Sequence, residues 1–185
     1  MILGLDASTS TVGAVILNDN GQIVYKDFLS LKKVKELTEK GEEFENFITE
    51  LAKQYPITQV YIEEYAQKMS RGSSSAYTIT RLAAFNGIVQ FICKKTFSTV
   101  PILLNCTAAR KTCGIKVQSK KKAGKSAKEQ VFDWVSNNVI HDLPRKVLQS
   151  GPRKGLEVYI NEASDITDAW VIARAGFDLA MPQTN

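Results

Sequence analysis

Short apolar runs separated by turn residues dominate the first thirty residues of the chain. Residues 2–5 and 12–17 are apolar, and Asn18, Asp19, Asn20 and Gly21 follow as residues that tolerate the positive φ of tight turns. A further strand is expected from Ile23 to Leu31. Short turns join antiparallel neighbours, so the pattern predicts a three-stranded antiparallel meander.

The next segments alternate between helical and strand patterns. Phe44, Phe47, Ile48 and Leu51 recur at i, i+3, i+4 and i+7, which predicts a helix beginning near Thr38 as its cap. Residues 60–62 then read as a buried strand that ends at a pair of glutamates. Residues 76–93 are apolar on nearly every side, and such a helix lies either in the core or in an interface.

The last part of the chain continues this alternation. We expect a strand at 100–104, a helix at 127–139, a basic excursion at 140–160 with a short strand at 156–160, and a final helix at 164–180. The order predicts an α/β domain whose mixed sheet combines the antiparallel meander with two parallel strands, with helices on both faces. Neither a repeat nor a linker divides residues 1–185, so we expect one domain.

Composition narrows the classes of function. No apolar run approaches the roughly 20 residues of a membrane span, and the first residues lack a secretory signal, so we expect a cytoplasmic protein without a membrane partner. Three scattered cysteines and a single histidine, His141, argue against a disulfide framework, a zinc site or a catalytic histidine.

Positive charge is concentrated in one segment. The formal net charge is +5, and residues 110–128 contain no acid. Such a segment is typical of a surface that binds a polyanion, although a solvated loop is the alternative. Its basic residues are Arg110, Lys111, Lys116, Lys120, Lys121, Lys122, Lys125 and Lys128.

Four carboxylates are candidates for a metal site. Asp6 and Glu63 each follow an apolar run, while Asp165 and Asp168 are three apart and share one face in the expected first turn of the last helix. Neighbouring strands would bring all four together, and such a cluster is favourable mainly around cations. Glu64 is an alternative to Glu63 as the metal ligand on that strand. Asp165 and Asp168 also have another explanation, because acids at the start of a helix complement the helix dipole.

Carboxylate oxygens suit Mg²⁺, for which Mn²⁺ can substitute. Two such ions about 3.5–4 Å apart can activate water and stabilise the leaving oxygen of a phosphodiester. This chemistry requires neither histidine nor cysteine, which agrees with the composition. The residues alone therefore indicate magnesium-dependent hydrolysis as a hypothesis.

Four segments, in order, resemble the RuvC family of Holliday junction resolvases. The opening motif of that family resembles Leu3-Gly4-Leu5-Asp6 with Gly13-Ala14-Val15-Ile16. The strand that carries its second acid resembles Val60-Tyr61-Ile62-Glu63-Glu64. Thr107 to Lys111 with Gly114 resembles their basic stretch. Ala163-Ser164-Asp165-Ile166-Thr167-Asp168-Ala169 resembles their final helix with its two acids.

This resemblance implies an RNase H-like fold and a homodimer that cuts two strands of a four-way DNA junction. It assigns the catalytic acids to Asp6, Glu63, Asp165 and Asp168, and it places Lys128, with Lys111 as a weaker companion, near the scissile phosphate. Tyr65 and Arg71, which follow the second acid, are further expected DNA contacts. We expect the dimer to form on the helix at 76–93, with Phe85, Ile88 and Phe91 as candidate contacts.

Some features depart from the family. Ala7-Ser8 replaces the Pro-Gly that bacterial members usually carry, and the 140–160 segment is longer. A less selective nuclease of flaps and forks is therefore an alternative, as is a DNA-binding module without activity. Asp6-Ala7-Ser8-Thr9 with Gly13 also resembles the phosphate loop of sugar kinases and actin-like ATPases, but those proteins use two such domains.

Overall fold

A five-stranded mixed sheet forms the centre of the molecule in the computed structural model, which describes residues 1–65 and 76–181. The strand order is β3-β2-β1-β4-β5. The first three strands are antiparallel, and β4 and β5 continue the sheet in parallel. This arrangement confirms the expected meander with two parallel strands. The strands are β1 (Ile2–Ala7), β2 (Thr11–Leu17), β3 (Ile23–Ser30), β4 (Gln59–Glu63) and β5 (Ile102–Leu104).

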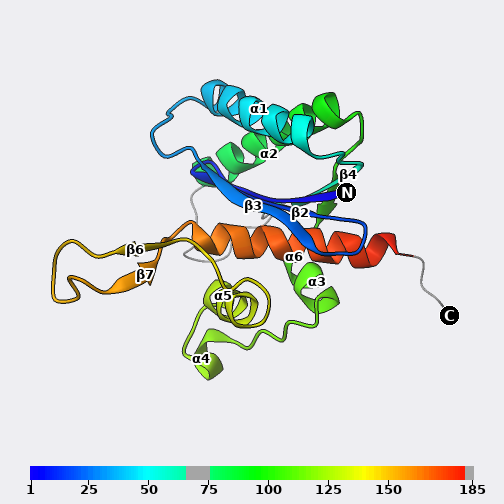
Figure 1. Ribbon diagram of the computed structural model, residues 1–185. Helices are drawn as coiled ribbons and strands as arrows, with labels where there is room; N and C mark the ends of the chain where they lie inside the picture. Colours follow the sequence, from blue (N-terminus) through cyan, green and yellow to red (C-terminus); the bar gives the residue numbers. More distant parts are fainter. Residues whose placement is uncertain (66–75, 182–185) are drawn as a thin grey trace.

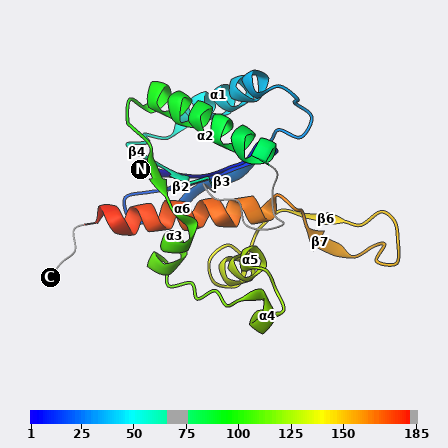
Figure 2. The same cartoon turned by 180° about the vertical axis from the view of Figure 1, so that it is seen from behind.

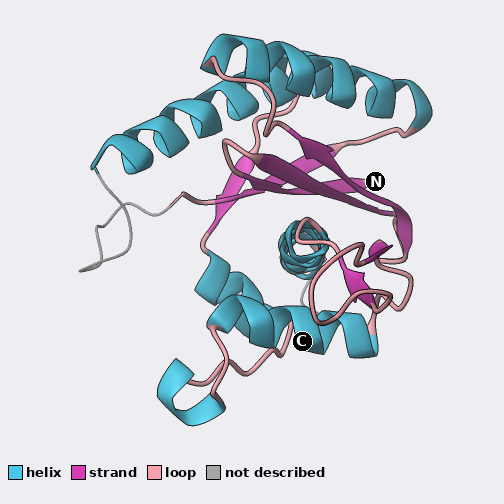
Figure 3. Cartoon of the chain, turned by 90° about the vertical axis from the view of Figure 1, so that its left-hand side faces the viewer, coloured by secondary structure: helices cyan, strands magenta, loops and turns pink. Residues whose placement is uncertain are grey.

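Helices cover both faces of this sheet (Figures 1 and 3). One face carries α1 and α2, which pack on each other, and the other carries α6, with α3 and α5 packed against its far side. The apolar side chains form one cluster on each face of the sheet. The helices are α1 (Leu37–Gln54), α2 (Ala76–Phe97), α3 (Cys106–Thr112), α4 (Lys120–Ala123), α5 (Ala127–Asn138) and α6 (Ala163–Ala180).

Glycines on the sheet let α6 approach it closely. A Cβ atom at Gly4 would lie 2.4 Å from the backbone nitrogen of Ala173, and one at Gly13 would lie 2.1 Å from the carbonyl oxygen of Asp165. Any larger residue would push the helix away from β1 and β2. The two glycines therefore fix the height of α6 above the sheet, and Gly13 does so at the turn that carries Asp165.

Several local elements differ from the sequence prediction. The predicted cap at Thr38 is wrong, because α1 begins at Leu37 with Glu36 as its N-cap, and this cap makes no side-chain hydrogen bond. Asp165 lies in the first turn of α6 as expected, but the helix starts at Ala163 and Asp168 falls in the following turn. The two acids still share one face because they remain three residues apart.

The basic 140–160 segment forms a hairpin that projects from the body of the molecule (Figures 1 and 2). Its second strand, β7 (Glu157–Tyr159), was expected, but its partner β6 (Arg145–Val147) was not. Arg145 spans the pair, donating to Glu157 at 3.0 Å and to the Tyr159 hydroxyl at 2.8 Å. The hairpin leads directly into the start of α6.

The helix α2 is exposed along one side. Phe85 is fully buried against the core, so its predicted place in a shared surface is wrong, whereas Phe91 is 66% exposed. Ile88 is partly buried.

Within residues 1–65 and 76–181, no helix is long and apolar enough to cross a membrane.

Candidate active site

The sheet register brings the first two candidate acids together. Parallel pairing aligns Leu5 of β1 with Ile62 of β4, so Asp6 and Glu63 leave adjacent strands at the same level. The close contact of Gly13 with α6 places Asp165 beside them, and Asp168 follows on the same helix face. The four predicted carboxylates therefore converge from three elements that are distant in sequence.

The ammonium group of Lys128 lies among these carboxylates. Its Nζ is 2.6 Å from Oδ1 of Asp165, 3.4 Å from Oδ2 of Asp168 and 4.0 Å from Oδ2 of Asp6. The N-terminus of α5 is fixed by a capping box in which the Ser126 hydroxyl accepts from the Glu129 amide, and the Glu129 carboxylate accepts from the Ser126 amide. This cap holds the first turn of α5, and with it Lys128, over the acids.

Arg110 also faces the acids. Its guanidinium lies 3.7 Å from Oδ1 of Asp168, and its side chain is only 16% exposed. The helix α3 that carries it is capped by Asn105, whose side chain accepts from the amides of Thr107 and Ala108. The guanidinium of Arg110 thus faces the carboxylate cluster, and its contact with DNA stays a prediction.

Two contacts to Glu63 had no signal in the sequence. The Asn86 side chain of α2 donates to the Glu63 backbone carbonyl at 3.2 Å. The Cys106 thiol of α3 forms a side-chain hydrogen bond with Glu63, which opposes in part the burial that raises the pKa of this carboxyl. These two residues support the end of β4 from opposite faces of the sheet, and only the folded structure brings them there.

The carboxylates repel one another in a poorly solvated place. Burial, followed by the charges of Glu63 and Asp168, raises the pKa of Asp6 well above its ordinary value. Burial is also the main cause of the raised pKa of Glu63 and of Asp168, and for Asp168 the charges of Lys128 and Arg110 oppose it. Positive charge from two residues therefore offsets the repulsion only in part.

This electrostatic state favours a cation at the cluster. The donors are carboxylate oxygens, which suit Mg²⁺ or Mn²⁺. Among the described residues, no three His, Cys, Asp or Glu side chains are already arranged around a metal position. The ammonium of Lys128 occupies the space between Asp165, Asp168 and Asp6. The donor set thus fits a hard divalent ion, provided that Lys128 moves aside.

Among the described residues, the other predicted DNA contacts form no ion pair with the carboxylate cluster. Lys125 pairs with Asp133 at 2.6 Å, whereas the remaining basic residues of 110–128 are exposed and form no ion pair with another described residue. Beside them is a cavity of about 550 Å³ between α3 and the start of α5. Tyr65 is partly buried just beyond β4, and Arg71 lies outside the described residues. The exposed basic residues of the 110–128 segment that form no such ion pair are Lys111, Lys116, Lys120, Lys121 and Lys122.

Glu64 takes a different position from Glu63. Its backbone amide donates to the carbonyl of Leu104 at 2.9 Å and continues the pairing of β4 with β5. The charge of Glu63, by contrast, contributes to the raised pKa of Asp6. The geometry therefore places Glu63, the residue at the end of β4, beside the other three acids.

Comparisons with known proteins bear on the fold. Neither a protein-family model nor a curated protein matches this sequence. The structure is similar to that of Thermus thermophilus RuvC in complex with a Holliday junction substrate, with a TM-score of 0.62, 12% identity, and coverage of 98% of this chain and 95% of that one. A second Thermus thermophilus RuvC structure matches with a TM-score of 0.55, 17% identity and coverage of 95% and 93%. The chain therefore has the RuvC-like, RNase H-like fold that its motifs predicted.

Proposed function

We propose that this protein is a metal-dependent endonuclease that cuts branched DNA, with the four-way junction as its substrate. One observation carries the proposal: Asp6, Glu63, Asp165 and Asp168 converge next to Lys128 in a chain with the RuvC-like fold. The neighbour bound to a Holliday junction substrate supports DNA as the ligand. Paired cutting by a homodimer belongs to the same proposal.

The four carboxylates would hold Mg²⁺ or Mn²⁺, two ions in each site. Bound there, these ions supply an activated water and stabilise the leaving oxygen of the phosphodiester. The side chains of the protein itself would supply positive charge and hold the reacting groups in position. The Lys128 ammonium, once displaced from Asp165, can bind an oxygen of the scissile phosphate. Arg110 stays with Asp168 and limits the repulsion within the cluster.

A cleavage assay tests this function. Labelled four-way junction, fork, flap and plain duplex are incubated with the protein and Mg²⁺, and we expect cuts in the junction and not in the duplex. Asp168→Asn should reduce the cutting rate by about 100-fold or more while DNA binding persists, since it removes a ligand of the ions that stabilise the transition state. Asp178→Asn, on the same helix but paired with Arg174, is the matched control and should cut normally.

Other outcomes point to the alternatives. Equal rates on flaps, forks and junctions would replace the resolvase with a less selective branched-DNA nuclease. Junction binding without cutting in Mg²⁺ or Mn²⁺ would leave a DNA-binding module. Tight binding of a nucleotide instead of DNA would return the chain to the kinase-like interpretation of its first motif.

A further inference from the structure

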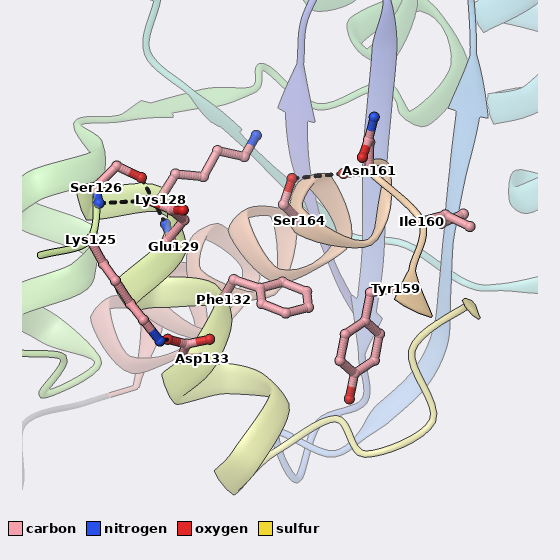
Figure 4. Close-up of a pocket in the computed structure, with 10 residues that line it drawn as sticks. All are labelled: Lys125, Ser126, Lys128, Glu129, Phe132, Asp133, Tyr159, Ile160, Asn161 and Ser164. Carbon is pink, nitrogen blue, oxygen red and sulfur yellow. Dashed lines mark hydrogen bonds and ion pairs between the residues drawn. The ribbon is translucent and has the colours of Figure 1, made fainter. Parts of the chain in front are cut away.

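A cavity of about 480 Å³ lies beside the carboxylate cluster, between the start of α5 and the junction of β7 with α6 (Figure 4). This size is within the roughly 300–1,000 Å³ typical of small-molecule sites. Phe132 and Tyr159 lie next to each other within it, with ring centroids 5.0 Å apart and planes at 76°. The cavity is thus lined by aromatic rings, unlike the lysine-rich surface of α4.

Tyr159 is held firmly in place. The Arg145 guanidinium lies over its ring at 4.4 Å from the centroid and donates to its hydroxyl at 2.8 Å. Ile160 follows it in the lining, and the side-chain hydroxyl of Ser164 donates to the carbonyl of Asn161 at 2.9 Å, which fixes the turn into α6. The hairpin therefore has a structural role at this place: it presents Tyr159 to the cavity.

The cavity and the carboxylate cluster share a wall. Lys128 lines the cavity, while its Nζ donates to Asp165 at 2.6 Å. Ser164, which also lines the cavity, directly precedes Asp165 in α6. A phosphate held at the acids would therefore have the adjacent part of its own strand at the mouth of the cavity.

The charges that line the cavity are balanced and not positive as a whole, because Lys125 and Lys128 are matched by Glu129 and Asp133. Lys125 is paired with Asp133 at 2.6 Å, and the Glu129 carboxylate accepts from the Ser126 amide at 2.7 Å. Both carboxylates line the cavity and would repel an anion. A flat, uncharged group that stacks on aromatic rings fits better, and an unpaired nucleobase has this chemistry.

We propose that this cavity receives one unpaired nucleobase of the strand that is cut, within a few nucleotides of the scissile phosphate. The proposal rests on the proposed function, because it requires branched DNA at the acids. Unpaired bases are available at a branch point but not in plain duplex, so the pocket would add to the preference for branched DNA. The exposed side-chain amide of Asn161, which can donate and accept, would contact the edge of the base.

The test combines base removal with a change in the protein. Binding to a four-way junction is measured in EDTA, which prevents cutting, with single abasic sites placed in turn around the branch point. We expect one position at which the wild type loses about 10-fold in affinity, as removal of one base–aromatic stack does. Phe132→Leu, which keeps an apolar side chain but removes the ring, should abolish the penalty at that position alone.

Matched variants make the result specific. Tyr25→Leu removes a ring from another partly exposed aromatic pair, with Tyr55, and should keep the abasic penalty of the wild type. Asn161→Ala, on the exposed rim, should keep the stacking penalty but weaken any preference among the four bases there. If Phe132→Leu proves unstable, this rim variant supplies the test of the same pocket.

The outcomes separate the two proposals. The base pocket would be overturned if the wild type prefers the junction but the wild type and Phe132→Leu lose the same affinity at every abasic position. The proposed nuclease function would still stand in that case. An Asn161→Ala variant with unchanged base preference would count against the pocket as well. No preference of the wild type for branched DNA over duplex would overturn the proposed function, and the pocket with it.

Discussion

At the scale of single residues, the carboxylate cluster is a place where the metal-free protein carries unfavourable charge. Burial and the charges of Glu63 and Asp168 raise the pKa of Asp6, so the folded state holds this proton more tightly than the unfolded state. Between the ordinary pKa and the raised one, folding therefore takes up protons, and the free energy of unfolding falls as pH rises. Cations at the cluster reduce the repulsion among its carboxylates and so stabilise the folded protein.

Asp6→Asn should accordingly make the metal-free protein more stable while it stops cutting. The amide removes one charge from the repulsive cluster, and each kcal/mol gained raises Tm by about 2–4 °C in a domain of this size. Thermal melts in EDTA at pH 5, 6, 7 and 8 should show the largest gain at the highest pH. The exposed Glu43→Gln on α1 is the control. Equal melting temperatures for Asp6→Asn and wild type at pH 8 would contradict this electrostatic account.

The sequence predicted the acids but not the residues that hold them. Asp6, Glu63, Asp165 and Asp168 followed visible apolar runs or shared a helix face, and the family resemblance reinforced the choice. By contrast, the turn of Arg110 toward Asp168 depends on how α3 packs on α6, and no periodicity encodes that contact. The contact of Gly13 with α6 is equally a property of the folded chain.

At the scale of elements, the long helices and the apolar strands were predicted, whereas several short polar elements were not. The strands of the sheet were recognised as short apolar runs bounded by turn or loop residues, α1 by its apolar stripe of period 3.6, and α2 as a long segment that is apolar on nearly every side. The short elements α3, α4 and β6 have too few residues for a period, so tertiary contacts and caps decide them. Asn105 was a usable signal, because asparagine is a common N-cap residue.

The basic segment divides into two parts by position. Arg110 and Lys128 face the acids, whereas the lysines of α4 are exposed at the edge of the molecule (Figure 2). Replacing Lys120, Lys121 and Lys122 by serine should weaken binding to all DNA sequences alike. The log–log salt slope should flatten by about 0.9 for each phosphate of the duplex arms that the variant no longer neutralises. Binding is measured between about 50 and 200 mM salt, a range over which such slopes are clear.

A charge-matched control separates local binding from net charge. Lys53, Lys94 and Lys95 lie at the ends of α1 and α2, on the opposite face of the sheet from α6. Their replacement by serine removes the same total charge and should leave the slope close to that of the wild type. If the salt slope flattens equally in both triple variants, α4 does not bind DNA locally. The basic segment would then be a solvated loop, which is the alternative interpretation.

At the scale of the whole molecule, the proposed function requires two sites. One cluster can cut one strand at a time, and a four-way junction is resolved by two matched incisions. Closed two-fold symmetry supplies two identical sites through one self-complementary surface. The exposed side of α2 is suited to such a surface, because Ala84, Gly87 and Phe91 lie on it at i, i+3 and i+7 and a Cβ at Gly87 would meet nothing within 4 Å.

Phe91→Glu should therefore separate the dimer without unfolding the chain. Phe91 is 66% exposed within one chain, so a charge there costs little in the monomer but would be buried at the shared surface. Sedimentation at micromolar concentration should give about twice the 20.5 kDa chain mass for the wild type and a single chain mass for the variant. The variant should nick junctions singly and lose paired cutting. Leu179→Glu, at an apolar position near the end of α6 that is 59% exposed, should remain dimeric. A monomeric wild type that still made coordinated incisions would exclude the two-fold arrangement, because one carboxylate cluster would then have to serve both strands in turn.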